Sequence, residues 1–153
     1  MQVFRIASAK YSKALIASGN AARWNRENEL VLYAAQHRSL ATLELVVHRN
    51  SLPTTIKYET MVISIADDPT FITDISIKQL PKNWQSTAAY SDLQSIGSEW
   101  YKTQQSLILR VPSVIIPQEH NFIINTRHPD FFSGKIALTK REEFYFDNRL
   151  LKD

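Results

Sequence analysis

Hydrophobic and polar positions alternate in several short stretches of the chain, which is the pattern of half-buried β-strands. Residues 3–6 show this alternation, and residues 30–35 are apolar almost throughout, which predicts a central strand. The same reasoning predicts further strands at residues 60–66, 74–80, 106–111, 122–125, 135–139 and 143–146.

Helical spacing of apolar residues is clearest at residues 39–48. Ser39 is a good N-cap residue because its hydroxyl can accept from free backbone N–H groups of the first turn. Leu40, Leu43 and Val47 then fall on one face, and Glu44 lies close to the centre of that face. We therefore expect a helix that turns a carboxylate inward.

Residues 91–104 predict the second main helix, with Ser91 and Gln94 in a capping-box pattern. Gly97 lowers helix stability by ~1 kcal/mol relative to alanine, which favours a close-packing role for it. A short helix is also expected at residues 11–17, ending at Gly19-Asn20. Strands and helices that do not alternate regularly predict the α+β class.

The composition fits one globular domain that spans residues 1–153, with 44% hydrophobic and 22% charged residues. The net charge is +3 and the basic residues are scattered, so direct binding of nucleic acid is not expected. The chain has no cysteine, which excludes disulfides, a thiol nucleophile and cysteine-ligated zinc. No apolar run approaches the ~20 residues of a membrane helix, and residues 1–10 read as a strand rather than a signal peptide. We expect a cytoplasmic protein without membrane contact.

Common catalytic and binding signatures are missing from the sequence. There is no glycine-rich phosphate loop, no H-E-x-x-H pattern, no EF-hand loop and no G-x-S-x-G elbow. The four histidines lack metal-ligand spacing, so no metal site is expected.

The inward carboxylate of Glu44 is the most informative single feature. Burial of a carboxylate is costly unless it has a partner or a function. Spacing alone leaves two interpretations open: a structural ion pair with Arg23 or another base, and a functional acid.

Short motifs along nearly the whole chain resemble those of the RES domain family. They are Arg23-Trp24-Asn25, Leu30-Val31-Leu32-Tyr33, Ala41-Thr42-Leu43-Glu44, Leu80-Pro81 with Trp84, Val111-Pro112-Ser113, Asn121, Asn125, Arg127-His128-Pro129, and Phe146-Asp147 with Arg149. The arginine, glutamate and serine for which the family is named are Arg23, Glu44 and Ser113.

The resemblance implies a mixed or antiparallel split sheet with flanking helices, similar to diphtheria-toxin-like ADP-ribosyltransferases. It also implies a toxin that cleaves the nicotinamide–ribose bond of NAD, with water or inorganic phosphate as acceptor and no further cofactor. An Xre-type antitoxin is the implied partner, and a homodimer within the toxin–antitoxin complex is a further expectation. The alternatives are an ADP-ribosyltransferase that modifies a protein, and an interaction module without activity.

The resemblance assigns roles to five residues. Glu44 would hold the ribose 2′-hydroxyl and stabilise the oxocarbenium-like centre. Arg23 would bind the diphosphate or a ribose, and Arg5 is a second candidate for the phosphates. Tyr33 would stack on nicotinamide, and Ser113 would hydrogen-bond substrate or position Arg23. Without the resemblance, Tyr33 reads as a core aromatic residue and Ser113 as a turn residue.

Two departures from the family pattern lie beside Arg23. Ala21-Ala22 stand where the family usually has glycines, and Arg26 stands where a glycine usually follows Asn25. Because glycine lets a loop approach phosphate closely, these departures put the geometry of the phosphate-binding turn in question.

Overall fold

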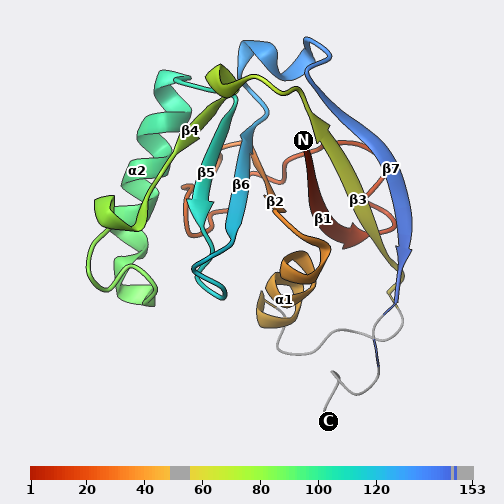
Figure 1. Ribbon diagram of the computed structural model, residues 1–153, viewed down its shortest axis with the longest axis horizontal. Coiled ribbons are helices and arrows are strands. Elements are labelled where there is room, and N and C mark those ends of the chain that lie inside the picture. The colour runs from red at the N-terminus through yellow and green to blue at the C-terminus, as the bar shows by residue number, and fades with distance from the viewer. Residues whose placement is uncertain (49–55, 146, 148–153) are drawn as a thin grey trace.

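The main element of the fold is one seven-stranded sheet, seen in a computed structural model that describes residues 1–48, 56–145 and 147 (Figure 1). Its strands are β1 (Gln2–Ser8), β2 (Val31–Ala35), β3 (Tyr58–Ile65), β4 (Ile72–Asp74), β5 (Ile108–Pro112), β6 (His120–Asn125) and β7 (Ile136–Phe144). They lie in the order β4-β5-β6-β2-β1-β3-β7. β4 and β5 pair in parallel and the other neighbours pair antiparallel.

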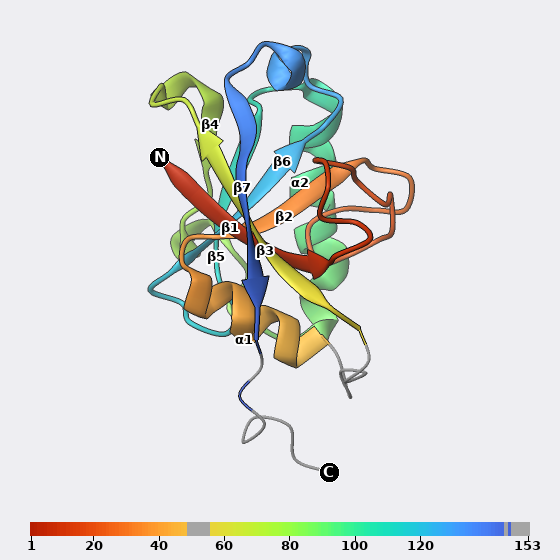
Figure 2. The same ribbon diagram turned by 90° about the vertical axis from the view of Figure 1, so that its right-hand side faces the viewer.

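The sheet is split between β1 and β2. Phe4 and Ala35 form the one registered pair between these strands, whereas β1 pairs with β3 over its whole length. Such a narrow junction lets the two halves diverge, and Figure 2 shows β1 running across the direction of β2 and β6. The predicted α+β class with a mixed, split sheet is confirmed.

Two helices flank the two halves of the sheet. Leu40 of α1 (Arg38–His48) packs into a cluster with residues of β1, β2 and β3. Leu93 and Trp100 of α2 (Tyr90–Thr103) pack against β5 and β6. Figure 1 shows the two helices well apart, with α2 beside β4 and β5, and α1 below β2. In the part of the chain that the structure describes, no helix is long and apolar enough to cross a membrane.

The helix predicted at residues 39–48 is confirmed as α1, which begins one residue earlier. Its expected buried face is wrong in part: Leu40 is fully buried, but Leu43 is 38% and Val47 60% exposed. Ala41 takes the place of Leu43 in the contact with the sheet. The later turns of α1 lie instead beside a cavity, which Leu45 and Val47 line.

The second predicted helix is confirmed as α2, but its expected capping box is wrong. The helix begins at Tyr90, and Gln94 Nε2 donates across to the Ala22 carbonyl at 2.8 Å. The close-packing role of Gly97 is confirmed, because a Cβ there would lie 1.8 Å from the carbonyl oxygen of Trp24. Both contacts fix the chain around Trp24 against α2.

The short helix expected at residues 11–17 is wrong. Ser12 is fully buried and donates to the Glu59 carboxylate, and Leu15 and Ala17 pack against the sheet core. These long-range contacts hold the segment in an irregular conformation.

The strand expected at residues 74–80 is also wrong. β4 ends at Asp74, and Ser76 N–H then donates to Gln79 Oε1 at 2.7 Å, starting the 3₁₀ helix Ile77–Gln79. The last two predicted strands form one strand, β7, with an irregularity opposite Val62. The predicted strand at residues 143–146 and the final family motif extend to residues that lie outside the described part of the chain: Phe146, Arg149 and Leu150.

Candidate active site

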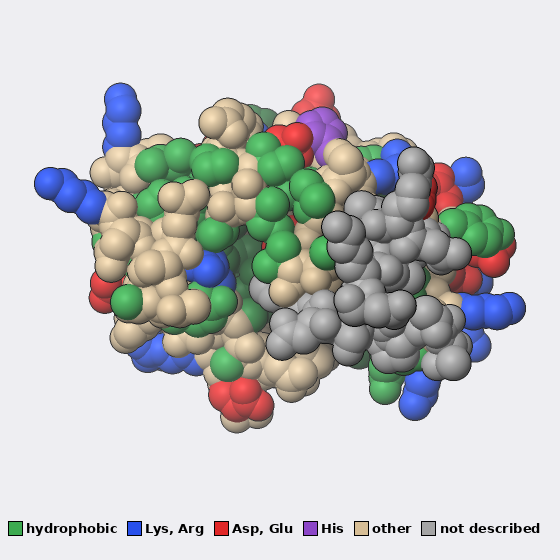
Figure 3. Space-filling model, turned by 90° about the horizontal axis from the view of Figure 1, so that it is seen from below, with side chains coloured by type: hydrophobic (Ala, Val, Ile, Leu, Met, Phe, Trp, Pro, Cys, Tyr) green, Lys and Arg blue, Asp and Glu red, His purple; other side chains and the backbone are tan. Residues whose placement is uncertain are grey.

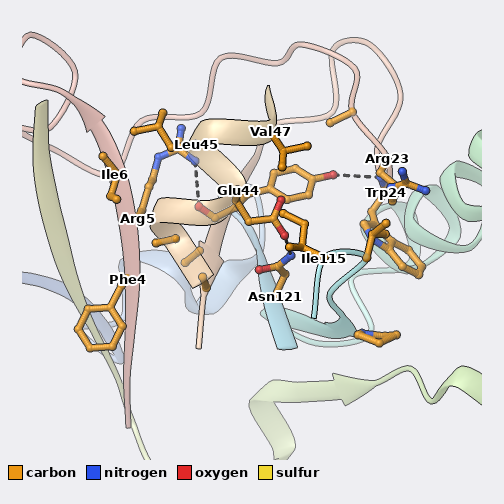
Figure 4. Close-up of a pocket in the computed structure, with 17 residues that line it drawn as sticks. Phe4, Arg5, Ile6, Arg23, Trp24, Glu44, Leu45, Val47, Ile115 and Asn121 are labelled. Carbon is orange, nitrogen blue, oxygen red and sulfur yellow. Dashed lines mark hydrogen bonds between the residues drawn. The ribbon is translucent and has the colours of Figure 1, made fainter. Parts of the chain in front are cut away.

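A cavity of about 390 Å³ lies between α1, the middle of β1, the end of β2 and the start of β6, with the loop at residues 22–24 and the loop that follows β5 completing its walls. Arg5, Arg23, Tyr33 and Glu44 all line it, so the fold brings together four of the five predicted residues. Figure 3 shows this hollowed face with hydrophobic side chains gathered around it, and Figure 4 shows Glu44 beside Asn121, with Arg5 and Arg23 on opposite sides of them. Among the described residues, no group of three or more acidic or histidine side chains could hold a metal ion.

The carboxylate of Glu44 accepts hydrogen bonds from Ser113, which follows β5, and from Asn121 of β6. Its Oε1 accepts from Asn121 Nδ2 at 2.6 Å and from Ser113 Oγ at 3.2 Å. The Ser113 hydroxyl is fully buried and itself accepts from the N–H groups of Ile115 and Ile116, at 3.1 and 3.2 Å. Because a hydroxyl has one proton, these two N–H bonds leave it directed at Glu44.

Ser113 therefore orients Glu44. The expected contact of Ser113 with Arg23 is not among its hydrogen bonds within the described chain. Asn121 was one of the positions that carry the family resemblance, but the sequence reasoning gave it no role in the site. The available signal was a polar amide at the start of an otherwise apolar strand. The register of β6 places Asn121 opposite Ala35, at the end of β2 that leads into α1.

The ring of Tyr33 lines the cavity while its hydroxyl is fixed to the neighbouring loop. The hydroxyl accepts from Trp24 N–H at 3.1 Å (Figure 4), and it donates to Asn25 Oδ1 at 2.8 Å. Burial raises the pKa of Tyr33 above its ordinary value of 10.0, so the phenol stays neutral at physiological pH. Tyr33 thus offers the cavity an aromatic surface rather than an acid or a base.

Arg23 is held by the segment that leads into α2. Its Nη1 donates to the carbonyl oxygens of Trp84 and Ser86, at 3.1 and 3.3 Å. Its guanidinium lies 4.4 Å from the ring centroid of Tyr90. These contacts, and not an ion pair with Glu44, orient Arg23, which removes the structural explanation that pairs these two residues.

Arg5 lies on the other side of the cavity and spans the split in the sheet. Its Nη1 donates to the carbonyl oxygen of Tyr33 at 2.9 Å (Figure 4). Burial lowers the pKa of Arg5 from its ordinary value of 12.5, but a guanidinium remains charged in proteins. The cavity therefore has one cation at each side, Arg5 and Arg23. The carboxylate of Glu44 lies between these two residues (Figure 4).

The backbone conformation of the loop beside Arg23 does not require glycine at positions 21 and 22. Ala21 and Ala22 have negative φ, and the left-handed conformation falls instead on Asn28, with φ of 67°. Glu29 is buried and its Oε2 accepts from Ser98 Oγ of α2 at 2.9 Å. Polar side chains thus brace the turn where the family uses glycine.

A family model of the RES domain matches residues 2–147 of this chain. The chain belongs to the RES domain family. This RES domain is 34% identical over 131 residues to the Prs ADP-ribosylating toxin of Sphingobium sp. (strain YBL2), covering 85% of this chain and 80% of the relative. It is 32% identical over 154 residues to Toxin Res of Yersinia enterocolitica, covering 98% and 99% of the two chains.

The fold of this RES domain is similar to that of a solved structure, the M. tuberculosis MbcT–MbcA toxin–antitoxin complex. The TM-score is 0.75 at 16% sequence identity, and the alignment covers 94% of this RES domain and 83% of the matched chain. At that identity the likeness concerns the fold, and it confirms the single α+β architecture derived from the sequence.

Proposed function

We propose that this RES domain is a toxin that degrades NAD by cleaving the bond between nicotinamide and ribose. The observation that carries the proposal is the carboxylate of Glu44, held by Asn121 and Ser113 beside the ring of Tyr33. Glu44 is the one acid among the described residues that line the cavity. The relatives named as toxins add to this argument.

The chemistry needs only one carboxylate. Nicotinamide leaves as a neutral base that takes both electrons of the C–N bond, so no general acid has to protonate it. Ordinary glycosidases differ, because they use two carboxylates. A positive centre develops on the ribose, and a preorganised negative charge at Glu44 stabilises it. Water then adds to the same carbon and loses a proton, which gives ADP-ribose, or phosphate adds and gives its 1″-phosphate.

The remaining lining residues fit a dinucleotide. The Tyr33 ring would stack on nicotinamide, and Arg23 and Arg5 would bind the diphosphate by charge-assisted hydrogen bonds. A cavity of about 390 Å³ lies within the range of small-molecule sites and suits the nicotinamide riboside end of NAD.

A second candidate is transfer of ADP-ribose to a protein. The relative called Prs ADP-ribosylating toxin, at 34% identity, favours it. The bond that breaks is the same, and a side chain of a target protein replaces water as acceptor.

We further propose that an Xre-type antitoxin covers the mouth of the cavity and that both proteins act in the cytoplasm, where NAD is present. The fold shared with the MbcT–MbcA toxin–antitoxin complex supports a protein partner. Co-expression of the neighbouring antitoxin should restore growth and cellular NAD.

The test is product analysis by mass spectrometry after incubation of purified, antitoxin-free protein with NAD, with and without phosphate. Release of nicotinamide with ADP-ribose or its 1″-phosphate supports the proposal and identifies the acceptor. ADP-ribose bound covalently to protein in a cell lysate supports the second candidate. Folded protein that leaves NAD intact over hours under all of these conditions contradicts both.

A further inference from the structure

The guanidinium of Arg23 is oriented by a platform that contains no acid. Two carbonyl oxygens, of Trp84 and Ser86, accept from Nη1, and the ring of Tyr90 lies 4.4 Å from the guanidinium carbon. Tyr90 is the first residue of α2 and is not among the described residues that line the cavity. It therefore contacts the site through Arg23.

We propose that Tyr90 is a positioning residue, whose stack with Arg23 sets the affinity of the site for the diphosphate of a dinucleotide. The inference deepens the proposed function and rests on it. It assigns to Tyr90 a role in binding that is separate from the chemistry at Glu44.

Three other arginines of the described chain are held by carboxylates instead. Arg38, Arg110 and Arg141 each pair with a carboxylate, Glu142, Asp74 and Glu59 respectively. A carboxylate would fix Arg23 equally well, but it would compete with an anionic ligand for the same N–H groups. An aromatic ring and carbonyl oxygens fix the orientation and leave the positive charge uncompensated.

The geometry also leaves a suitable edge of the guanidinium for a ligand. Among the hydrogen bonds of the described residues, those of Arg23 all use Nη1. Nε and Nη2 form the edge that makes forked, two-bond contacts with phosphate oxygens. Loss of the ring would free the guanidinium to rotate, so ordering it again would weaken binding.

α2 fixes the backbone of Arg23 as well as its side chain. Gln94 Nε2 donates to the carbonyl oxygen of Ala22 at 2.8 Å, and Gly97 lies against the carbonyl oxygen of Trp24. The residues before and after Arg23 are thus attached to the helix that begins with Tyr90. The platform and the loop form one unit, which explains how a ring outside the cavity can control a cation inside it.

The test compares Tyr90→Leu, which removes the ring, with Tyr90→Phe, which keeps it. Binding is measured by calorimetry in the Glu44→Gln background, with NAD and with nicotinamide riboside, which lacks the diphosphate. A cation–π contact of about 1 kcal/mol predicts that Tyr90→Leu weakens NAD binding about fivefold. Nicotinamide riboside should bind unchanged, and Tyr90→Phe should restore NAD affinity.

In protein that retains Glu44 and is therefore active, Tyr90→Leu should raise KM for NAD about fivefold and leave kcat within twofold. Tyr11→Leu is the matched control, because Lys10 stacks on Tyr11 at a site that does not line the cavity. The control should change neither affinity nor KM.

Three results would overturn the inference while the proposed function stands. They are Tyr90→Leu with unchanged NAD affinity, an equal loss of affinity for NAD and nicotinamide riboside, and an equal loss in Tyr90→Phe and Tyr90→Leu. If the protein without substitutions neither binds nor cleaves NAD, both the inference about Tyr90 and the proposed function are wrong.

Discussion

Glu44→Gln separates the charge of the site from its shape. In the structure, Glu44 Oε1 accepts from Asn121 Nδ2 at 2.6 Å and from Ser113 Oγ at 3.2 Å. The amide oxygen of glutamine can accept both hydrogen bonds, so neither donor loses its partner. The substitution therefore removes the negative charge and preserves these two hydrogen bonds.

The expected loss of stability is small. A hydrogen bond to a charged group contributes roughly 1 kcal/mol more than a neutral one, so two such bonds lose about 2 kcal/mol. The relief from desolvating a half-buried carboxylate offsets part of this loss. For a chain of this size, the melting temperature should change by less than about 5 °C.

The expected loss of rate is much larger. Removal of one preorganised electrostatic group lowers kcat on the order of 10²-fold or more. Affinity for NAD should stay within a few-fold, because the arginines and the Tyr33 ring are unchanged. Glu44→Ala is the contrasting variant: it leaves the fully buried Ser113 hydroxyl without its acceptor, which costs about 1–3 kcal/mol.

The assay combines three measurements on each variant: melting temperature, NAD affinity and nicotinamide release per folded molecule. We expect Glu44→Gln to be folded, to bind NAD and to be nearly inactive. If Glu44→Gln unfolds easily but turns over NAD at a near-normal rate per folded molecule, Glu44 is a structural acid and the catalytic assignment is wrong.

Three further predictions concern other parts of the molecule. Gly97→Ala should lower stability by about 1–3 kcal/mol, measured by denaturant unfolding, because its Cβ would lie 1.8 Å from the Trp24 carbonyl oxygen; unchanged stability would contradict the close approach. Asn121→Leu should lower kcat roughly tenfold with little change in NAD affinity, the effect of one charge-assisted hydrogen bond; an unchanged kcat would show that Ser113 alone suffices. The hydrogen bonds from Arg38, and after them that from Lys140, lower the pKa of Glu142 from 4.5 to about 2, so they stabilise the fold fully above pH 4.5, and that contribution is lost as pH falls towards 2. Thermal melts of Glu142→Gln should therefore differ from those of the parent above pH 4.5 and converge with them near pH 2, and a constant difference would refute the linkage.

Local patterns predicted the parts of the fold that local physics determines. The alternation at residues 3–6 and the apolar run at residues 30–35 correctly predicted β1 and β2, and helical spacing predicted α1 and α2 within one residue at their starts. The prediction of a helix around Ser12 failed because Ser12 hydrogen-bonds to the Glu59 carboxylate, 47 residues away, and this long-range contact outweighs the local helix propensity. A local stretch of sequence around Ser12 does not include Glu59, so it cannot indicate this hydrogen bond.

The site shows the same division. The motifs around Arg23, Tyr33 and Glu44 identified residues that do line one cavity. The motifs also included Ser113 and Asn121, but the contact of Asn121 with Glu44 could not be derived from them, because the two residues lie 77 positions apart and meet only through the register of β6. The role of Tyr90 also could not be predicted from the sequence, since its ring contacts Arg23 only when α2 has packed against the sheet.

The long separation between Glu44 and its two donors has a consequence during synthesis of the chain. α1 leaves the ribosome early, but Ser113 and Asn121 follow only after about three quarters of the protein has been made, and β2 gains its long partner strand β6 at the same time. An incomplete chain carries the carboxylate without the groups that aim it. Under the proposed function, a nascent polypeptide is therefore inactive, and the site at Glu44 is complete only when β6 has emerged and paired.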